Sequence, residues 1–517
     1  MQGRALLRSV LVLTVAACAA CYSAEPAQDP ARSQQRFTSI VTNLDTGGDL
    51  LVVANLEGYV QGLVDGITPL LLTAADSAGD PATAKATIAK IPGFLQKNGF
   101  YAVQGFGLSV VPLADGLNKT KSFVCRDPAA ADLPLWRGLV GGAPRYLKCA
   151  AFLPADTVLS RTGTGDPKQL WSLVRSGVAE FGGPQGTAGF EQMLSAAATN
   201  MGVNLDAVIA SFGEEGFFSV QLSRSATVEL PAAPGAAPVK IPRPALLIGI
   251  ALQDGTLLKA VESSLARAKV AMLKTPAESI EIRSVNLPVP APFPVQPSFT
   301  IYSNFFLFGS TPEVVSDAIK AFNGKSGLIA MPEYRQAVEG LPVVNNGVFY
   351  LSPRLLNTIR DVQKAAAQGG GEQGAQMAGV VQRLLGAGGD VQSAFVVQNL
   401  NSGVLTTGRS TSGGKEMVGS VLMAPAGLMA AIAIPSFMKA RTTSVQNACI
   451  NNLRMIDAAK EQWALENNKA AGQAVDAKDI VDYLKGGQIP VCPQGGTYKL
   501  NPIGNNPECN IPGHALR

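Results

Sequence analysis

The feature that most limits the fold of this chain is a two-residue alternation of apolar and polar side chains. From Phe218 to Ser223, the apolar residues would face one side of a strand, and the serines and the glutamine the other. Two further alternating runs, 394–400 and 404–409, are separated by Asn401-Ser402-Gly403, which is typical of a hairpin turn. Strands with one polar face favour antiparallel or mixed sheets over a buried parallel sheet.

Helices are predicted directly after several of these strands. Residues 305–308 precede Ser310-Thr311-Pro312 and an amphipathic run to Phe322, and residues 152–159 lead to Asp166-Pro167 and a similar run. Thr and Asp side chains accept hydrogen bonds from the free N–H groups of a first helical turn, and proline at the first helical position loses no hydrogen bond. We therefore expect an α+β body, with helices on one face of antiparallel or mixed sheets.

The length of 517 residues predicts two or three domains. We divide the chain into a signal peptide with a lipobox (1–21), a polar tether (22–36), two α+β units (37–145 and 146–412), and a C-terminal helix with a small head (413–517).

The N-terminus is typical of an exported protein. Arg4 and Arg8 precede an apolar run over 10–21, which is too short to span a bilayer. Val15-Ala16-Ala17-Cys18 resembles the bacterial lipobox, so we expect Cys18 to be lipidated; the alternative is an ordinary signal peptide cleaved near Ala24. Both interpretations place the chain in the cell envelope, and the first makes it a periplasmic or outer-membrane-associated lipoprotein.

Export of the chain determines the environment in which its seven cysteines are expected to lie. An oxidising compartment favours two local disulfides, with Cys125 and Cys149 as one candidate pair and Cys492 and Cys509 as the other. Cys449 is left over and is expected to be a small buried residue. Because the one CxxC spacing lies in the signal region, we expect no zinc ribbon, no thioredoxin motif, no metal and no cofactor in the mature chain.

Several catalytic classes are disfavoured by composition. His514 is the one histidine, close to the C-terminus, so a multi-histidine metal site is excluded and a surface or packing role is expected. Gly324-Lys325-Ser326 lacks the upstream glycine of a phosphate loop, and the Gly105/Gly107 pair lacks the third glycine of a dinucleotide fingerprint. The adjacent acids Glu214 and Glu215 would face opposite ways in a strand and are interpreted as a charged turn. We therefore do not expect an enzyme.

Nucleic acid is not an expected partner. The net charge is only +4, and the basic residues are dispersed without a run that interleaves them with aromatic residues.

The C-terminal region carries a helical stripe. Val445, Cys449, Leu453, Ile456, Ala459 and Trp463 recur at spacings of three or four residues, as on the buried face of an amphipathic helix. Before this stripe, no charged residue lies between Glu416 and Lys439, and this stretch would extend about 33 Å as a helix. The sequence leaves open whether 417–438 crosses a membrane, lies on one, is buried in the body, or docks against partner helices.

This region resembles a type IV pilin or type II secretion pseudopilin. The resemblance covers about 90 residues, rests on the sequences 430–441, 449–454 and 459–464, and continues through Cys492-Pro493, Gly495-Gly496-Thr497-Tyr498 and Gly513-His514. It implies a long pilin-like helix followed by a small disulfide-containing head. The prepilin peptidase site is missing, because Gly414 and Val418 stand where its Phe and Glu would fall, and Pro425 interrupts the apolar run.

The body more loosely resembles an uncharacterised family of bacterial exported proteins, through residues 152–157, Leu170-Trp171 and 348–352. That resemblance implies no activity.

The sequence thus predicts an exported, lipid-anchored envelope protein that acts by binding, in or near a type II secretion or pilus-like assembly. The membrane, through the lipid and the 417–438 segment, and pseudopilin or secretion-apparatus proteins are the expected partners. Leu428, Ile432, Ile434 and Phe437 are the expected helix-docking residues. The alternative is an exported enzyme or small-molecule-binding protein with a passive C-terminal appendage.

Overall fold

The computed structural model describes residues 30–77, 80–230, 239–277, 280–286, 295–324, 327–369, 392–411, 413, 448–484, 486–492, 496–511 and 514–516. The lipidation site Cys18, the docking residues Leu428, Ile432, Ile434 and Phe437, and the stripe residue Val445 lie outside these ranges. The chain separates into two compact units, 1–415 and 416–517. We refer to the first as the body and to the second as the C-terminal unit.

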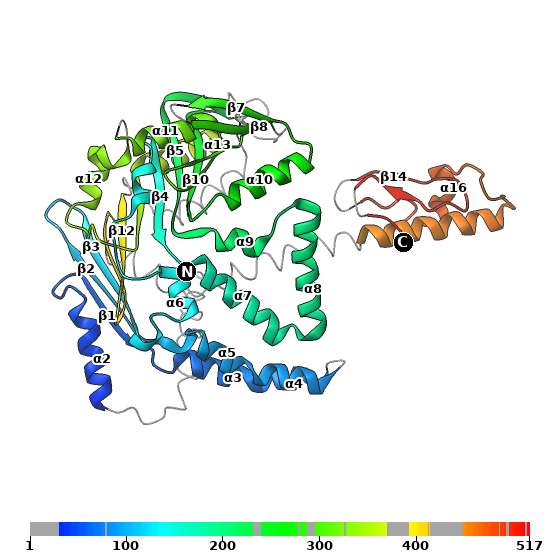
Figure 1. The fold of residues 1–517 in the computed structure, drawn as a ribbon. Helices are drawn as coiled ribbons and strands as arrows, with labels where there is room; N and C mark the ends of the chain where they lie inside the picture. The colour runs from blue at the N-terminus through cyan, green and yellow to red at the C-terminus, as the bar shows by residue number, and fades with distance from the viewer. Residues whose placement is uncertain are drawn as a thin grey trace. The chain divides into compact units, whose positions relative to one another are not determined.

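One antiparallel sheet organises the body (Figure 1). Within the described residues it has 13 strands, in the spatial order β1-β2-β3-β13-β12-β11-β4-β5-β6-β10-β9-β8-β7. Every neighbouring pair is antiparallel, which confirms the predicted α+β class in its coarse form. The strands are β1 (Leu50–Asn55), β2 (Val103–Pro112), β3 (Asn118–Arg126), β4 (Thr157–Thr164), β5 (Phe212–Leu230), β6 (Val239–Leu252), β7 (Met272–Ala277), β8 (Ile280–Val285), β9 (Ser298–Tyr302), β10 (Phe305–Gly309), β11 (Gly347–Leu351), β12 (Ser393–Leu400) and β13 (Gly403–Ser410).

Helices lie around this sheet, with α3, α4 and α5 at the opposite end of the body from α11 and α12 (Figure 1). The helices are α2 (Pro30–Thr42), α3 (Tyr59–Ala75), α4 (Pro81–Ala89), α5 (Ile91–Lys97), α6 (Pro134–Val140), α7 (Pro167–Phe181), α8 (Gly183–Ala196), α9 (Leu205–Ala210), α10 (Thr256–Arg267), α11 (Pro312–Phe322), α12 (Pro332–Val338) and α13 (Pro353–Gly369). Short helical turns are η1 (Phe100–Ala102), η2 (Pro128–Ala130), η3 (Lys148–Phe152), η4 (Ala197–Met201) and η5 (Leu328–Ala330).

The predicted helix starts and the predicted hairpin are confirmed. The Thr311 hydroxyl accepts a hydrogen bond from the Val314 N–H at 3.4 Å, and the Asp166 carboxylate accepts one from the Lys168 N–H at 3.0 Å. β12 and β13 pair in register from Leu400 opposite Gly403, across the Asn401-Ser402 turn.

The predicted strand through Phe218 lies in β5, but the side predicted to be polar and wet is buried, and Leu222 on the other side is buried as well. Ser219 is fully buried and Gln221 is 4% exposed, whereas Phe218 is 38% exposed. Ser219 and Gln221 share the face of Phe217, which belongs to the main core together with residues of α11. The amide of Gln221 donates to the Ser219 hydroxyl at 2.7 Å, so this buried pair partly satisfies itself.

The Gly105/Gly107 pair has a packing role. α2 crosses β2 there, and a Cβ on Gly107 would lie 2.4 Å from Ile40 and 2.7 Å from Leu44. Ile40 and Leu44 form a second core cluster with Phe123 and Cys125. The two glycines therefore let α2 approach the sheet closely.

Strands on both sides of residue 145 share the one sheet, and the division of the body predicted there stays a prediction.

The C-terminal unit combines a helix over 448–466 with a head of short elements: α16 (Ala477–Ile480), η6 (Val481–Tyr483), β14 (Tyr498–Lys499) and β15 (Glu508–Cys509). Figure 1 shows the helix along one side of this unit, with the head on the other. Ile456 packs with Ala459, Ile480 and Leu484, and Trp463 lies against this cluster. Cys449 and Leu453, from the same predicted stripe, are fully buried.

Of the helices in the described ranges, none has both the length and the apolar character needed to cross a bilayer. The 417–438 segment lies outside those ranges.

Candidate functional site

Three cysteines and the one histidine converge in the C-terminal unit. The sulfur atoms of Cys449, Cys492 and Cys509 and a ring nitrogen of His514 all lie within 4.8 Å of one another. Cys492 Sγ lies 3.8 Å from Cys509 Sγ and 3.7 Å from His514 Nδ1. Cys449 is fully buried, Cys492 is 2% exposed and His514 is 4% exposed, whereas Cys509 is partly exposed, so protein encloses most of this cysteine–histidine cluster.

Local structure explains how residues so far apart in sequence meet. Cys449 lies in the first described turn of the 448–466 helix, facing the head. Cys509 lies in β15 directly opposite Tyr498 of β14. An isolated bridge pairs Glu508 with Ala515, and this returns the chain so that His514 reaches the cluster.

Tyr498 and Asn452 lie beside the cysteine–histidine cluster and position its residues. The Tyr498 hydroxyl lies 3.4 Å from Cys449 Sγ. Asn452, one turn along the helix, donates to that hydroxyl at 3.2 Å and to the carbonyl of Val491 at 3.1 Å. Asn452 thus holds both Tyr498 and the segment that carries Cys492.

The environment affects the acidity of these groups. Burial, together with the neighbouring Cys492 and Cys509 thiols, raises the pKa of the Cys449 thiol to about 12. Burial and the Cys449 thiol also raise the pKa of the Tyr498 hydroxyl. Without an added cation, protonated groups are favoured at both positions.

The other two cysteines of the described residues, Cys125 and Cys149, lie in the body. Cys149 is buried in the main core, whereas Cys125 lies in the cluster beneath α2. Burial raises the pKa of both thiols. None of the five cysteines in the described residues forms a disulfide in this structure.

The chain was compared with known proteins. No family model, curated protein or solved structure matches it. The chemistry of the cysteine–histidine cluster therefore rests on its own geometry.

Sequence reasoning did not bring these four residues together. It paired Cys492 with Cys509, assigned Cys449 to packing, and gave His514 a surface or packing role. The available signal was the concentration of three cysteines and the one histidine after residue 448, with four residues between Cys509 and His514.

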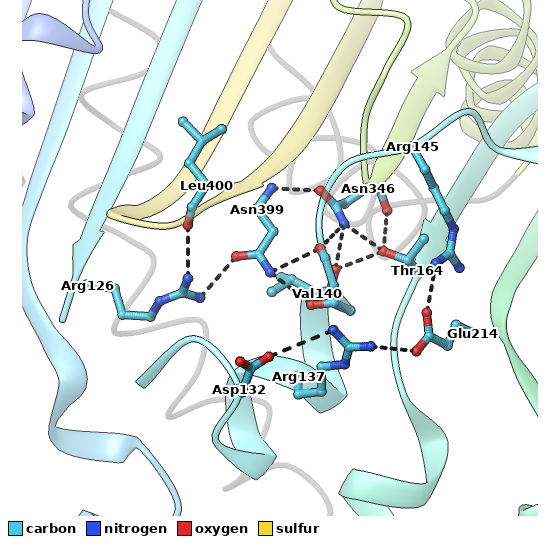
Figure 2. A network of polar contacts seen from close by, with 12 residues as sticks. Arg126, Asp132, Arg137, Val140, Arg145, Thr164, Glu214, Asn346, Asn399 and Leu400 are labelled. Carbon is cyan, nitrogen blue, oxygen red and sulfur yellow. Dashed lines mark hydrogen bonds and ion pairs between the residues drawn. The ribbon is translucent and has the colours of Figure 1, made fainter. Parts of the chain in front are cut away.

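The body holds a second polar site, an amide network at the end of α6 (Figure 2). The Asn346 amide donates to the Val140 and Gly142 carbonyls at 3.1 and 2.8 Å, and that of Asn399 donates to the Gly141 carbonyl at 2.8 Å. The last carbonyls of a helix have no partner within it, so Asn346, directly before β11, and Asn399, in β12, satisfy the end of α6 and the residues after it. Arg126 is 1% exposed and donates to the Asn399 side chain at 3.0 Å, which extends the network to β3.

Ion pairs lie next to this network (Figure 2). Glu214 accepts hydrogen bonds from Arg137 at 3.0 Å and Arg145 at 2.8 Å, and Glu215 lies 3.5 Å from Arg145. The two acids were interpreted as a charged turn, but they lie within β5, and both contact Arg145. The register of β5 shifts between Phe212 and Gly216, which removes the regular alternation there.

Three carboxylates of the body with basic partners, Glu214, Asp45 and Glu333, have lowered pKa values. Burial opposes ionisation of Glu214, but hydrogen bonds and charge from Arg145 and Arg137 outweigh it and lower the pKa. The same balance, with lysine or arginine partners, lowers the pKa of Asp45 and of Glu333. A general acid requires a raised pKa, so these three carboxylates are suited to structural ion pairs.

Proposed function

We propose that this chain is an exported, lipid-anchored envelope protein that acts by binding through its C-terminal unit, in or near a type II secretion or pilus-like assembly. In this proposal the helix before the head is pilin-like and its apolar stem, 428–437, docks against partner helices. The lipid on Cys18 holds the protein at the membrane.

The observation that carries the proposal is the separate compactness of residues 416–517. This unit has its own core of Ile456, Ala459, Ile480 and Leu484 between a helix and a small head. A module with its own core can present a helix to a partner without support from the body. The sequence resemblance to pseudopilins indicates the kind of partner.

Co-purification tests the docking. The full chain with Ile432→Asp and Ile434→Asp is compared with wild type in gently solubilised envelopes. We expect wild type to recover pseudopilin or secretion-apparatus proteins and the double variant to lose them, because a helix-docking face does not tolerate buried carboxylates.

Val343→Asp provides the matched control. Val343 is 69% exposed on the body, so this variant should retain the partners. Recovery of the same proteins by wild type and the stem variant, or of no such proteins by wild type, contradicts the proposal.

Metabolic lipid labelling tests the anchor. Cys18→Ala should abolish the label, whereas Cys21→Ala, in the same signal region, should keep it. Undiminished label on the Cys18 variant excludes the lipid anchor.

A further inference from the structure

Two distances within the cysteine–histidine cluster match those of a tetrahedral metal site, and all four ligand atoms lie within 4.8 Å of one another. Zinc binds cysteine sulfur at about 2.3 Å and histidine nitrogen at about 2.0–2.1 Å, so two ligand atoms on a tetrahedron lie about 3.6–3.8 Å apart. The two distances measured, 3.8 Å between sulfurs and 3.7 Å from sulfur to nitrogen, agree with this. We propose that Cys449, Cys492, Cys509 and His514 bind one structural zinc ion.

A disulfide explains the cluster less completely. Any one disulfide uses two of the three cysteines and leaves the third thiol and the imidazole enclosed within the same few ångströms. A bond between Cys492 and Cys509 would leave Cys449, which is fully buried and faces both. A single metal ion uses all four groups.

The ligand set indicates which metal and which role. Three thiolates and one imidazole around a tetrahedron are typical of zinc, whereas oxygen-rich sites hold calcium or magnesium. Structural zinc sites are closed by four protein ligands, and catalytic ones keep a position open for water. Four protein ligands converge here, so the site is structural.

Neighbouring donors would support the bound ion. Three thiolates outweigh the charge of one zinc ion by one negative unit. The Tyr498 hydroxyl, 3.4 Å from Cys449 Sγ, lies where it can donate to that sulfur, and Asn452 fixes the tyrosine. Hydrogen bonds to the ligands of a metal orient those ligands and change the affinity for the metal.

A bound zinc ion would stabilise the head in place of a large hydrophobic core. In its described residues, the head has a small cluster around Ile456 and Ile480 and two short strands, β14 and β15. Small folding units of this kind are commonly stabilised by a metal or by disulfides. The ion would join the start of the helix, the segment at Cys492, β15 and the chain near its end. This inference does not depend on the proposed docking function.

Metal content and thiol reactivity test the proposal on the full chain, purified without chelator or reductant. We expect one zinc per chain by elemental mass spectrometry. Cys449, Cys492 and Cys509 should react with a thiol reagent only after a chelator is added. Zinc-free protein should take up cobalt(II) and develop the absorption of a tetrahedral cobalt–thiolate complex, which zinc then removes.

Variants locate the ion. Cys449→Ser and His514→Ala should each lose most of the bound zinc. Cys125 is a buried cysteine of the body outside the cluster, so Cys125→Ala should keep one zinc per chain. If a ligand variant does not fold, the cobalt spectrum of the wild-type chain and the number of its thiols that react only after chelation still test whether the cluster binds a metal. A Cys492–Cys509 disulfide without metal, free thiols without metal, or zinc that both ligand variants retain would overturn the proposal. Iron or copper in the cluster in place of zinc would overturn the assignment of the metal.

Discussion

The side-chain oxygen of Asn346 accepts a hydrogen bond from the backbone N–H of Asn399 at 2.7 Å, while its amide nitrogen donates to Val140, Gly142 and Thr164. Asn346 is 3% exposed, so every polar atom of this side chain is used inside the protein. The residue lies directly before β11 and joins β12 to the end of α6, two segments that are far apart in sequence.

Replacing Asn346 with Asp should destabilise the body by about 3 kcal/mol or more, because a carboxylate would face three acceptors in a buried site. Urea unfolding measures this, in a Trp463→Phe background where the fluorescence comes from Trp136 and Trp171 of the body. Asn304→Asp, at an exposed turn, is the matched control. Equal losses in both variants would contradict the structural role of the network.

The contact between α2 and β2 gives a second prediction. Gly107→Ala should destabilise the body by about 1–3 kcal/mol, because its Cβ would lie 2.4 Å from Ile40. Gly62→Ala, inside α3 with open space around the new Cβ, should instead be neutral or stabilising by up to about 1 kcal/mol. The same urea experiment compares them, and a harmless Gly107→Ala would show that α2 does not pack there.

The ion pairs of Glu214 predict a dependence on pH. Because Arg145 and Arg137 lower the pKa of this carboxyl in the folded chain, its contribution to stability is present above its ordinary pKa of 4.5 and is lost as the pH falls through the lower folded value. Glu214→Gln should therefore cost about 1–3 kcal/mol at pH 7 and progressively less below about pH 4.5.

Unfolding measured at several pH values tests this. Glu229→Gln removes an exposed carboxylate 3.6 Å from Lys240 and serves as the control, with a small effect at every pH. A Glu214→Gln effect that does not shrink in acid would contradict the assigned ion pairs.

Tyr498 provides a prediction on metal affinity. Tyr498→Phe removes the hydroxyl beside Cys449 Sγ and should weaken zinc binding about 10-fold or more, with the stoichiometry unchanged. Competition with a chromophoric chelator measures the affinity of the full chain. Tyr483→Phe, whose hydroxyl binds Glu466 away from the cluster, should leave it unchanged. Equal affinities in the two variants would exclude Tyr498 as a support of the site.

The sequence was informative where the signal is local. The Thr311 and Asp166 caps and the Asn401-Ser402 turn were predictable, because hydrogen bonds over two or three residues determine them. Which face of β5 is buried was not, since the side of Ser219 and Gln221 is also that of Phe217, which lies in the main core with residues of α11. The role of Gly107 likewise depends on α2, far away in sequence.

The cysteine–histidine cluster was missed for a related reason. A CxxC pair places two ligands on one turn and is visible locally, whereas here each ligand comes from a different turn or element. Cys509 and His514 meet only because Glu508 pairs with Ala515, and Cys449 arrives on a helix. Tertiary structure, and not local spacing, brings the four together.

X-ray absorption at the zinc edge of the purified full chain tests the central claim most directly. We expect a zinc signal with three sulfur neighbours at about 2.3 Å and one nitrogen neighbour at about 2.0–2.1 Å. Absence of zinc from the protein, or a zinc shell of oxygen and nitrogen without sulfur, would contradict the account.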